Sequence, residues 1–408
     1  MKKKFKIFTL GCKTNQYESQ AFSDQLKGLG LIVSEEGDAD ICIINACSVT
    51  HSADKKSLSA IKALKEKNKK AKFYITGCIG KEVIDLIGSD VIIIPNNQKN
   101  DLVATIFPER IVPKFYIKNF DGHTRAFVKI QDGCNSCCSY CVIPFTRGRS
   151  RSRSKDEIIF EITKLVDNGY QEIVLTGINI GEYNTEMSFE KLLNEIEKIE
   201  GLNRIKISSI DSKHITDDLI NILTSSEKMV SSLHLVLQSG SEKILRKMNR
   251  KYTPEFFLEK VEKIISRNPD FTFTTDVIVG FPSETAEDLE RTIDILNKVG
   301  FTKVHIFPYS KRPNTLAATF EEQIDEKIIH ERKKVLEDSA LRIAFKKREQ
   351  FIGREMDVLF EQPSDNMSFG STKNNLFIGV RDKIPANSVL KVKLKENKKE
   401  YILGELCK

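Results

Sequence analysis

Three cysteines on one short loop, Cys134, Cys138 and Cys141, constrain this chain more than any other feature of its sequence. They stand in the segment KIQDGCNSCCSYC with C-x3-C-x2-C spacing, directly after a run that predicts a β-strand. Thiolates are the usual ligands of iron-sulfur clusters, and three of them on so short a loop can surround one face of a cubane. A fourth ligand at matching spacing is missing. We therefore predict a [4Fe-4S] cluster with one iron open to a small-molecule ligand.

Other readings of the cysteine loop stay open at this point. Cys137 also permits a C-x2-C-x3-C set of Cys134, Cys137 and Cys141, and we treat Cys137 as a spare thiol. A zinc knuckle or a chance cysteine-rich loop is the alternative to a cluster. The six histidines never fall at zinc-ligand spacing, so we assign them no ligand role.

The length of 408 residues predicts two or three domains, since single cores seldom exceed about 200 residues. In the first part, short β-branched runs alternate with helical stretches, which indicates buried parallel strands in a doubly wound α/β domain over residues 1–117. These strands are expected at 6–10, 41–45, 73–76 and 91–94, and the stretch 95–118 is the expected linker.

A second α/β run predicts a partial (β/α)6 barrel over residues 118–345, because six strand-like segments alternate with helical ones. Its strands are expected at 126–130, 172–175, 204–208, 233–237, 272–279 and 303–307. One long charged helix is expected over 325–348. The remaining residues, 346–408, predict a small all-β domain with strands at 355–360, 374–380, 388–394 and 401–406.

Three more cysteines each follow a predicted parallel strand of the first domain: Cys12, Cys47 and Cys78. The carboxyl ends of parallel strands meet at one edge of a sheet, so these thiols should converge. We predict a second cluster on them, again with one vacant iron. Buried apolar cysteines are the alternative, which is our interpretation of Cys42 within its strand, and Cys407 is expected to be a free thiol.

The cysteine loop, its place after a barrel strand and the segments downstream resemble the radical S-adenosylmethionine (SAM) superfamily. The whole chain resembles the methylthiotransferase family within it, through segments such as GCKTNQYES, NACSVT, TGCIG, LTGINIGEY, LQSGSEKILRKMNRKYT, TDVIVGFPSET and HIFPYSKRPNT. The resemblance implies that the loop cluster binds SAM and donates the electron that cleaves it to a 5′-deoxyadenosyl radical. The resemblance further implies that the second cluster brings the sulfur and that another SAM supplies the methyl group, so that a C–H bond becomes C–S–CH3.

Polar side chains at the carboxyl ends of the barrel strands are expected, by this resemblance, to bind SAM: Thr176, Asn179, Ser208, Gln238 and Asp276. Buried barrel strands normally turn apolar side chains inward, so polar ones favour a ligand pocket. The alternative is that they only cap neighbouring helices.

Alternating basic residues predict two RNA contacts. Arg147, Arg149 and Arg151, with Arg153 beyond, would lie on one side of an extended segment and either grip phosphates or neutralise a cluster. A solvated basic loop is the alternative. In the last domain, Lys391, Lys393 and Lys395 alternate with apolar residues, which resembles the RNA-binding TRAM domain. Residues 361–373 depart from that pattern, which would weaken docking or leave the loop disordered, and ordinary edge-strand lysines are the alternative.

Residues KTNQY, directly after Cys12, resemble the family branch that acts on tRNA at N6-threonylcarbamoyladenosine 37 in the anticodon loop, giving its 2-methylthio derivative. Branches with Gln-Met-Asn there act on isopentenyladenosine in tRNA, and those with a proline soon after act on a ribosomal protein aspartate. Both stay open as alternatives. A non-catalytic iron-sulfur RNA-binding protein is a more distant one.

Composition adds weaker expectations. The net charge of +7 suits a polyanionic partner, and a solvated surface explains it equally well. No apolar run approaches the about 18 residues of a membrane span, so we expect a cytoplasmic protein with no membrane partner. We also expect a monomer. The expected reductant is of the flavodoxin or ferredoxin type, while the sulfur donor and the preferred tRNAs stay open.

Overall fold

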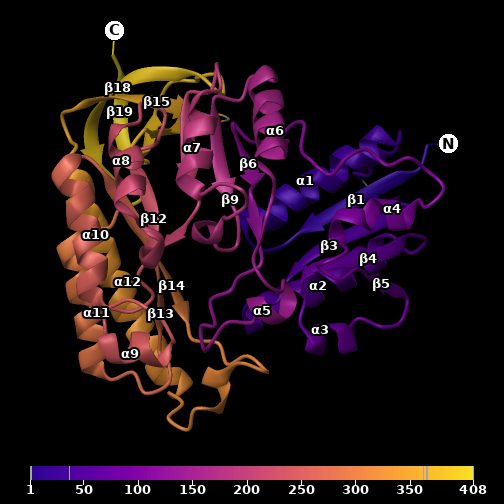
Figure 1. Cartoon of the computed structure of the whole chain (residues 1–408), viewed down its shortest axis with the longest axis horizontal. Helices are drawn as coiled ribbons and strands as arrows, with labels where there is room; N and C mark the ends of the chain where they lie inside the picture. Colours follow the sequence, from indigo (N-terminus) through magenta and orange to yellow (C-terminus); the bar gives the residue numbers. More distant parts are fainter. Residues whose placement is uncertain (1, 36, 362, 364–365, 408) are drawn as a thin grey trace.

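The computed structural model describes residues 2–35, 37–361, 363 and 366–407, which form three units (Figure 1). The first unit, in indigo and purple, contains a five-stranded parallel sheet in the order β2-β1-β3-β4-β5. The predicted strands are confirmed, and one two-residue edge strand was missed. The strands are β1 (Lys4–Thr9), β2 (Ile32–Val33), β3 (Ile41–Cys47), β4 (Lys72–Cys78) and β5 (Val91–Ile93).

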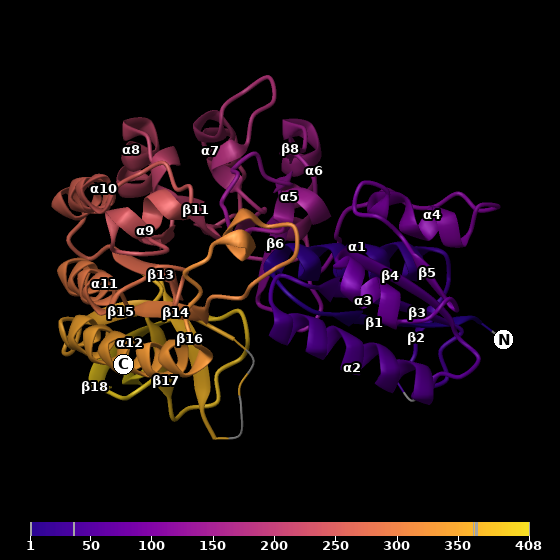
Figure 2. The same ribbon diagram turned by 90° about the horizontal axis from the view of Figure 1, so that it is seen from below.

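Helices cover both faces of this sheet because its central strands are apolar on both sides. Ile41 and Ile43 of β3 pack on the face of α1 (Lys13–Gly28) and α4 (Leu102–Ile106). Cys42 and Ile44 pack on the opposite face, against α2 (His51–Lys67) and α3 (Lys81–Leu86) (Figure 2). The doubly wound arrangement is confirmed, and Cys42 is a fully buried core residue. The 3-10 turn η1 (Lys99–Asp101) precedes α4.

The second unit is a partial barrel of parallel strands, as predicted. Its strands form sheets in the orders β10-β9-β6 and β11-β12-β13-β14, and β11 continues β10 after a bend. The edge strands β6 and β14 do not pair with each other among the described residues, so the barrel is open on that side. The strands are β6 (Arg125–Lys129), β9 (Glu172–Thr176), β10 (Arg204–Ile207), β11 (Ile210–Asp211), β12 (Ser232–Val236), β13 (Thr272–Val279) and β14 (Lys303–Pro308).

Six helices cover the outside of the barrel. Most begin at a Ser or Thr whose side chain accepts a hydrogen bond from a backbone N–H of the first turn, which fixes their starts. They are α6 (Lys155–Asp167), α7 (Phe189–Glu197), α8 (Asp217–Ser225), α10 (Pro254–Arg267), α11 (Ala286–Val299) and α12 (Glu326–Glu349). Shorter elements line the loops: β7 (Gln131–Asp132), α5 (Ile143–Thr146), β8 (Arg151–Ser152), η2 (Ile180–Glu182), η3 (Ser212–His214), α9 (Glu242–Lys247) and η4 (Leu316–Thr319).

The two faces of the barrel strands differ sharply in chemistry. The residues that face the helices are apolar, such as Val128, Leu175 and Ile205, and they form the largest core. The alternate residues face the interior of the barrel, here called the lumen, and many of them are charged. A closed barrel of this type fills its interior with branched apolar side chains. This lumen is therefore built to hold a polar ligand rather than to be a core. Its charged residues include Arg125, Glu172, Arg204, Lys206, His234, Asp276 and His305.

The third unit, in yellow in Figure 1, is a closed five-stranded barrel in the order β15-β16-β17-β19-β18. Its strands are β15 (Glu355–Phe360), β16 (Ser368–Thr372), β17 (Phe377–Val380), β18 (Val389–Asn397) and β19 (Ile402–Leu406). The expectation of a loop over 361–373 was wrong for Ser368–Thr372, which pairs with both β15 and β17. Residues 362, 364 and 365 of that range lie outside the described residues. Polar residues were read there as a loop, although Ser368 and Thr372 are buried.

This small barrel covers the amino-terminal end of the partial barrel. Arg204 Nη1 donates to the carbonyl oxygen of Ser371 over 2.9 Å. Thr272 Oγ1 donates to the carbonyl oxygen of Asn374 over 2.6 Å. Arg125 forms an ion pair with Glu361. The lumen is consequently closed at one end and accessible from the carboxyl ends of its strands. The exact domain boundaries stay a prediction.

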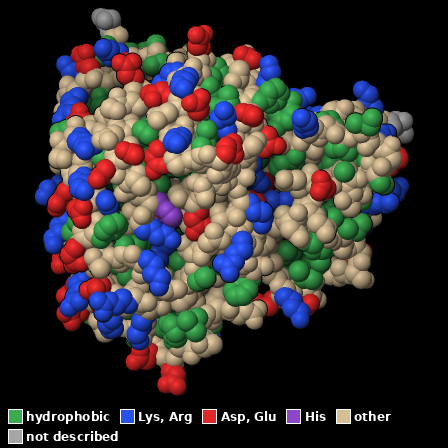
Figure 3. Space-filling model, in the orientation of Figure 1, with side chains coloured by type: hydrophobic (Ala, Val, Ile, Leu, Met, Phe, Trp, Pro, Cys, Tyr) green, Lys and Arg blue, Asp and Glu red, His purple; other side chains and the backbone are tan. Residues whose placement is uncertain are grey.

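Within the described residues, no helix combines the length and apolarity that crossing a membrane requires. Basic and acidic side chains are interspersed on the face shown in Figure 3, so the excess positive charge is not gathered there in one block.

Candidate active site

The cysteine loop leaves the carboxyl end of β6, the end at which parallel barrels place their sites. Gly133 turns the chain into the loop with φ of +72°, and a Cβ there would lie 2.1 Å from the carbonyl oxygen of Arg149. Only glycine fits this position. The loop is closed by a hydrogen bond from Cys134 N to the carbonyl oxygen of Gly148 over 3.1 Å.

Hydrogen-bond donors point at the sulfurs of this loop. Ser136 N and Asn179 Nδ2 lie 3.3 and 3.5 Å from Cys134 Sγ. Burial, together with the neighbouring Cys138 and Cys134, raises the pKa of the Cys141 thiol to about 12. Hydrogen-bond donors such as Ser136 N and Asn179 Nδ2 stabilise thiolates that ligate a cluster. The donor set therefore fits an iron-sulfur cluster.

Cys137 lies apart from the other thiols of the loop. Its side chain is exposed, and Cys137 Sγ is 3.7 Å from the carbonyl oxygen of Asn135. This geometry favours Cys134, Cys138 and Cys141 as the ligand set, with Cys137 as the spare thiol.

A buried arginine that sequence reasoning missed lies over this loop. Arg250 Nη1 is 3.6 Å from Cys138 Sγ and 3.2 Å from Asp211 Oδ2. It belongs to the segment MNRKYT, which is part of a segment that resembles the family, but the sequence pattern assigns no role to this side chain. A cavity of about 230 Å³ opens beside it. The cavity is lined by Asn135, Ser136, Cys137, Cys138, Asp211, Lys213, Asn249, Arg250 and Lys251.

The residues predicted to bind SAM fall into two groups. Asn179 and Gln238 reach the cysteine loop, where Gln238 Oε1 accepts a 2.8 Å hydrogen bond from Tyr140. Thr176 and Ser208 are buried at the ends of their strands.

Asp276 lies deeper, inside the lumen, where Asp276 Oδ1 is 3.3 Å from His234 Nε2. Ligand atoms of His234, Asp276 and His305 all lie within 4.8 Å of one another. Sequence spacing could not reveal this group, because its members stand on three different strands.

The structure also brings Cys12, Cys47 and Cys78 together. Cys47 and Cys78 are register partners on neighbouring strands, and Cys12 precedes α1 at the same edge of the sheet. Burial, together with the proximity of Cys78 and Cys12, raises the pKa of the Cys47 thiol to about 11. Gly77 precedes Cys78 with φ of +98°, and a Cβ there would lie 2.4 Å from the carbonyl oxygen of Ala46.

Arg147 connects the two groups of cysteines. It follows the cysteine loop of the barrel, and Arg147 Nε donates to Cys78 Sγ over 2.9 Å. Arg147 Nη1 also lies 2.8 Å from Asp132 Oδ1 and 3.0 Å from Glu18 Oε1. The prediction of an RNA contact is wrong for Arg147, because its side chain is fully buried. The alternative, neutralising a cluster, agrees with its contact to Cys78.

A buried charge network surrounds Arg147 and joins the first unit to the barrel. Lys99 Nζ lies 2.8 Å from Asp132 Oδ2, and Lys129 Nζ lies 3.0 Å from Glu18 Oε1. Although burial acts in the opposite direction, Lys129, Arg147 and Lys99 together hold the pKa of Asp132 well below its usual range. Both carboxylates are thus ionised and fix the facing edges of the two units.

Replacing Arg147 by methionine is expected to lower the free energy of unfolding by roughly 3 kcal/mol, because Glu18 and Asp132 would share fewer buried cations. Urea unfolding of the anaerobically purified protein measures this. Arg149→Met is the matched control, since Arg149 is exposed on the same loop and should change stability by less than about 0.5 kcal/mol. Equal effects of the two substitutions would contradict a bridging role for Arg147.

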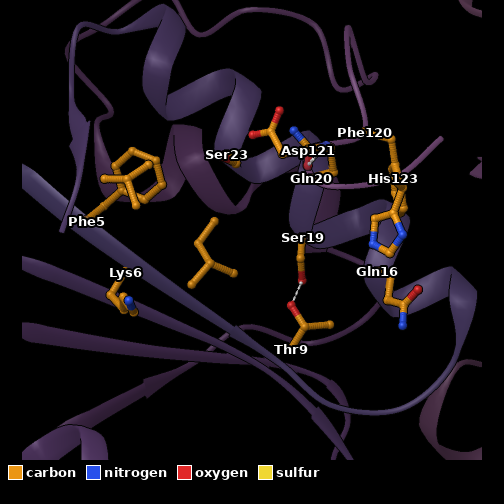
Figure 4. A pocket seen from close by; sticks show the side chains of 12 residues that line it. Phe5, Lys6, Thr9, Gln16, Ser19, Gln20, Ser23, Phe120, Asp121 and His123 are labelled. Atoms are coloured by element: carbon orange, nitrogen blue, oxygen red, sulfur yellow. Dashed lines mark hydrogen bonds between the residues drawn. The ribbon is translucent and has the colours of Figure 1, made fainter. Parts of the chain in front are cut away.

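A second cavity, of about 320 Å³, lies between β1, α1 and residues 120–123 (Figure 4). Its lining includes Lys6, Gln16 and His123, and Thr9 Oγ1 donates to Ser19 Oγ over 2.7 Å. None of the cysteines is among its described lining residues, so it is not part of the candidate active site.

The partial barrel and its cysteine loop define a radical SAM enzyme. The Radical SAM superfamily model matches residues 128–296, and the uncharacterized protein family UPF0004 matches residues 4–90. The fold is similar to that of the radical SAM methyltransferase TsrM from Kitasatospora setae, solved with cobalamin and a [4Fe-4S] cluster bound. The TM-score is 0.57 at 12% identity, covering 78% of this chain and 77% of that one.

Among curated proteins, the chain is 43% identical to the threonylcarbamoyladenosine tRNA methylthiotransferase MtaB of Chlamydia pneumoniae, over 98% of both chains. It is 34% identical to the tRNA-2-methylthio-N6-dimethylallyladenosine synthase of Thermoanaerobacter sp., over 98% of this chain and 92% of the other. The chain belongs to the radical SAM tRNA methylthiotransferase family. It is an enzyme of tRNA modification that uses SAM and a [4Fe-4S] cluster.

Proposed function

We propose that this enzyme adds a methylthio group to C2 of N6-threonylcarbamoyladenosine at position 37 of tRNA. The observation that carries the chemistry is the second group of cysteines, which faces the cysteine loop across Arg147. The higher identity to a relative named for threonylcarbamoyladenosine, 43% against 34%, supports the choice of nucleoside. The KTNQY segment after Cys12 supports it independently.

We assign the loop cluster to Cys134, Cys138 and Cys141, and a second [4Fe-4S] cluster to Cys12, Cys47 and Cys78. When bound, the loop cluster supplies the electron that cleaves SAM, and the second cluster supplies the sulfur. The protein orients these groups. Asn179 and Arg250 donate to the loop sulfurs, and Arg147 donates to Cys78. Thr176, Ser208, Gln238 and Asp276 are proposed as further SAM contacts at the barrel mouth.

The RNA surface is proposed on two parts of the chain. Arg149 and Arg151 are exposed beside the cysteine loop, and Lys391, Lys393 and Lys395 are exposed on β18. Strand β18 pairs with β15 on one side and β19 on the other, so these lysines do not protect an open edge. They form a basic stripe that suits a phosphate backbone, in which Lys395 Nζ also pairs with Glu405 Oε2 over 2.9 Å.

Replacing Lys391, Lys393 and Lys395 together by alanine is expected to weaken tRNA binding about tenfold in moderate salt, because up to three phosphate contacts are lost. The slope of log Kd against log salt concentration should fall by roughly two. Filter binding at several salt concentrations measures both. The matched control replaces three exposed lysines of α12, Lys327, Lys334 and Lys346, and removes the same charge. An equal loss of tRNA affinity in the control variant would mean that the β18 lysines act only through the net charge of the protein.

The nucleoside assignment is tested with two tRNAs that differ only at position 37, one with threonylcarbamoyladenosine and one with isopentenyladenosine. Reconstituted enzyme with dithionite and SAM should convert the first, and nucleoside mass spectrometry detects the product. Isopentenyladenosine is the second candidate, favoured by the 34% relative named for the dimethylallyl nucleoside. If the enzyme methylthiolated only isopentenyladenosine, that nucleoside would replace threonylcarbamoyladenosine as the assigned substrate.

The physiological setting follows from this proposal. We propose a cytoplasmic monomer that acts on the anticodon loop and takes electrons from a flavodoxin or a ferredoxin.

A further inference from the structure

A polar cavity of about 340 Å³ lies where the three units meet, beside β6, β9 and β10 of the partial barrel. Lys13 from the start of α1 lines it together with Arg125 and Lys206 of the barrel and Glu361 of the small barrel. Lys13 directly follows Cys12, so the cavity adjoins the edge where the second cluster is proposed. It is separate from the cavity beside Arg250.

Positive charge exceeds negative charge in this cavity. Arg125 is neutralised by Glu361 and lies 3.7 Å from Glu172. Neither Lys13 nor Lys206 takes part in an ion pair within the part of the chain that the structure describes. Lys13 Nζ lies 5.8 Å from the ring centre of Phe127, and Lys206 Nζ donates only to the neutral side-chain oxygen of Asn375.

The pKa of Lys206 shows that a charged ammonium group is unfavourable in this cavity. Burial, together with the positive charges of Arg125 and Lys13, lowers the pKa of Lys206 to about 7, although the carboxylate of Glu172 acts against them. Buried cations without a counter-ion are unfavourable, and a bound anion would relieve the strain on both lysines. The cavity therefore suits a ligand with one negative charge.

The proposed substrate offers such a group. The N6-threonylcarbamoyl substituent ends in a carboxylate, whereas an isopentenyl substituent is an uncharged hydrocarbon. We propose that Lys13 and Lys206 bind the carboxylate of the threonylcarbamoyl group, with Arg125 fixing the wall of the cavity. This inference rests on the proposed function and names the side chains that select its substrate. An alkyl group in the same cavity would leave both ammonium groups without a partner.

The test uses an anticodon stem-loop RNA with threonylcarbamoyladenosine at position 37, and the same RNA with that carboxylate converted to its methyl ester. Reconstituted wild-type protein should bind the acid about tenfold more tightly than the ester, because charge-assisted hydrogen bonds are lost. Fluorescence anisotropy measures both affinities. Lys13→Gln and Lys206→Met should each bind acid and ester with nearly equal affinity.

Lys327→Gln, at an exposed lysine of α12, is the control and should keep the wild-type preference. The comparison of acid and ester on the wild-type protein needs no variant to fold. Equal affinity for the two RNAs, or a preference that survives both substitutions, overturns the inference. If the enzyme methylthiolates the threonylcarbamoyl tRNA yet does not distinguish acid from ester in binding, only this inference fails. Turnover of isopentenyladenosine alone would remove the proposed function itself.

Discussion

Replacing Cys134, Cys138 and Cys141 together by alanine is expected to abolish both the release of 5′-deoxyadenosine and the formation of methylthiolated tRNA. These sulfurs receive the hydrogen bonds of Asn179 and Arg250, and no other thiol of the loop shares that position. Iron in the anaerobically reconstituted protein should fall from about eight to about four atoms per chain, because only the proposed second cluster remains. Iron analysis and chromatography of the SAM cleavage products measure the two effects.

Cys137→Ala is the matched control for this variant. Its thiol lies in the same loop but is exposed and faces a backbone carbonyl group. Iron content and SAM cleavage should stay at wild-type values. Loss of SAM cleavage in Cys137→Ala would instead support the C-x2-C-x3-C ligand set.

The elements that a local signal defines were predictable from the sequence. The strands of both parallel sheets are continuous β-branched runs such as IVLT in β9, and the covering helices start at Ser or Thr caps such as Thr285. The convergence of Cys12, Cys47 and Cys78 was also predictable, because parallel strands place their carboxyl ends at one edge. Periodicity and topology together specify these positions without any long-range contact.

The parts that failed or were missed depend on contacts between units. Arg147 looked like one more member of an exposed basic row, yet the carboxylates of Glu18 and Asp132 bury it. Arg250 contacts Cys138 because the chain after α9 folds back over the cysteine loop, which no local pattern indicates. Strand β16 contains buried serine and threonine whose sequence alone reads as a loop. None of these has a local pattern that distinguishes it from the solvated alternative.

One architectural feature unites the site. The carboxyl edge of the first sheet and the carboxyl ends of the barrel strands face each other, and Arg147 spans the boundary. Each side carries three proposed ligand thiols, which is one fewer than a saturated cluster uses. A substrate held between them would meet the SAM site on one side and the proposed sulfur site on the other. The charged lumen would receive its N6 substituent.

Replacing Cys12, Cys47 and Cys78 together by alanine is therefore expected to separate the two halves of the chemistry. The loop thiols and their donors Asn179 and Arg250 lie on the barrel and are unchanged, so SAM cleavage should continue and iron should fall to about four atoms per chain. Methylthiolated nucleoside should fall to background, because no sulfur site remains.

Cys42→Ala is the control for this variant, since Cys42 lies on the same sheet but is buried within the opposite-facing core away from the edge. It should lose some stability, about 1 kcal/mol, and keep both iron and product. Methylthiolation that persists in the triple variant would place the sulfur source outside these thiols. The facing arrangement of the two cysteine groups would then have another purpose. Loss of SAM cleavage in the triple variant would mean that the first unit is needed to hold the barrel site itself, through the network around Arg147.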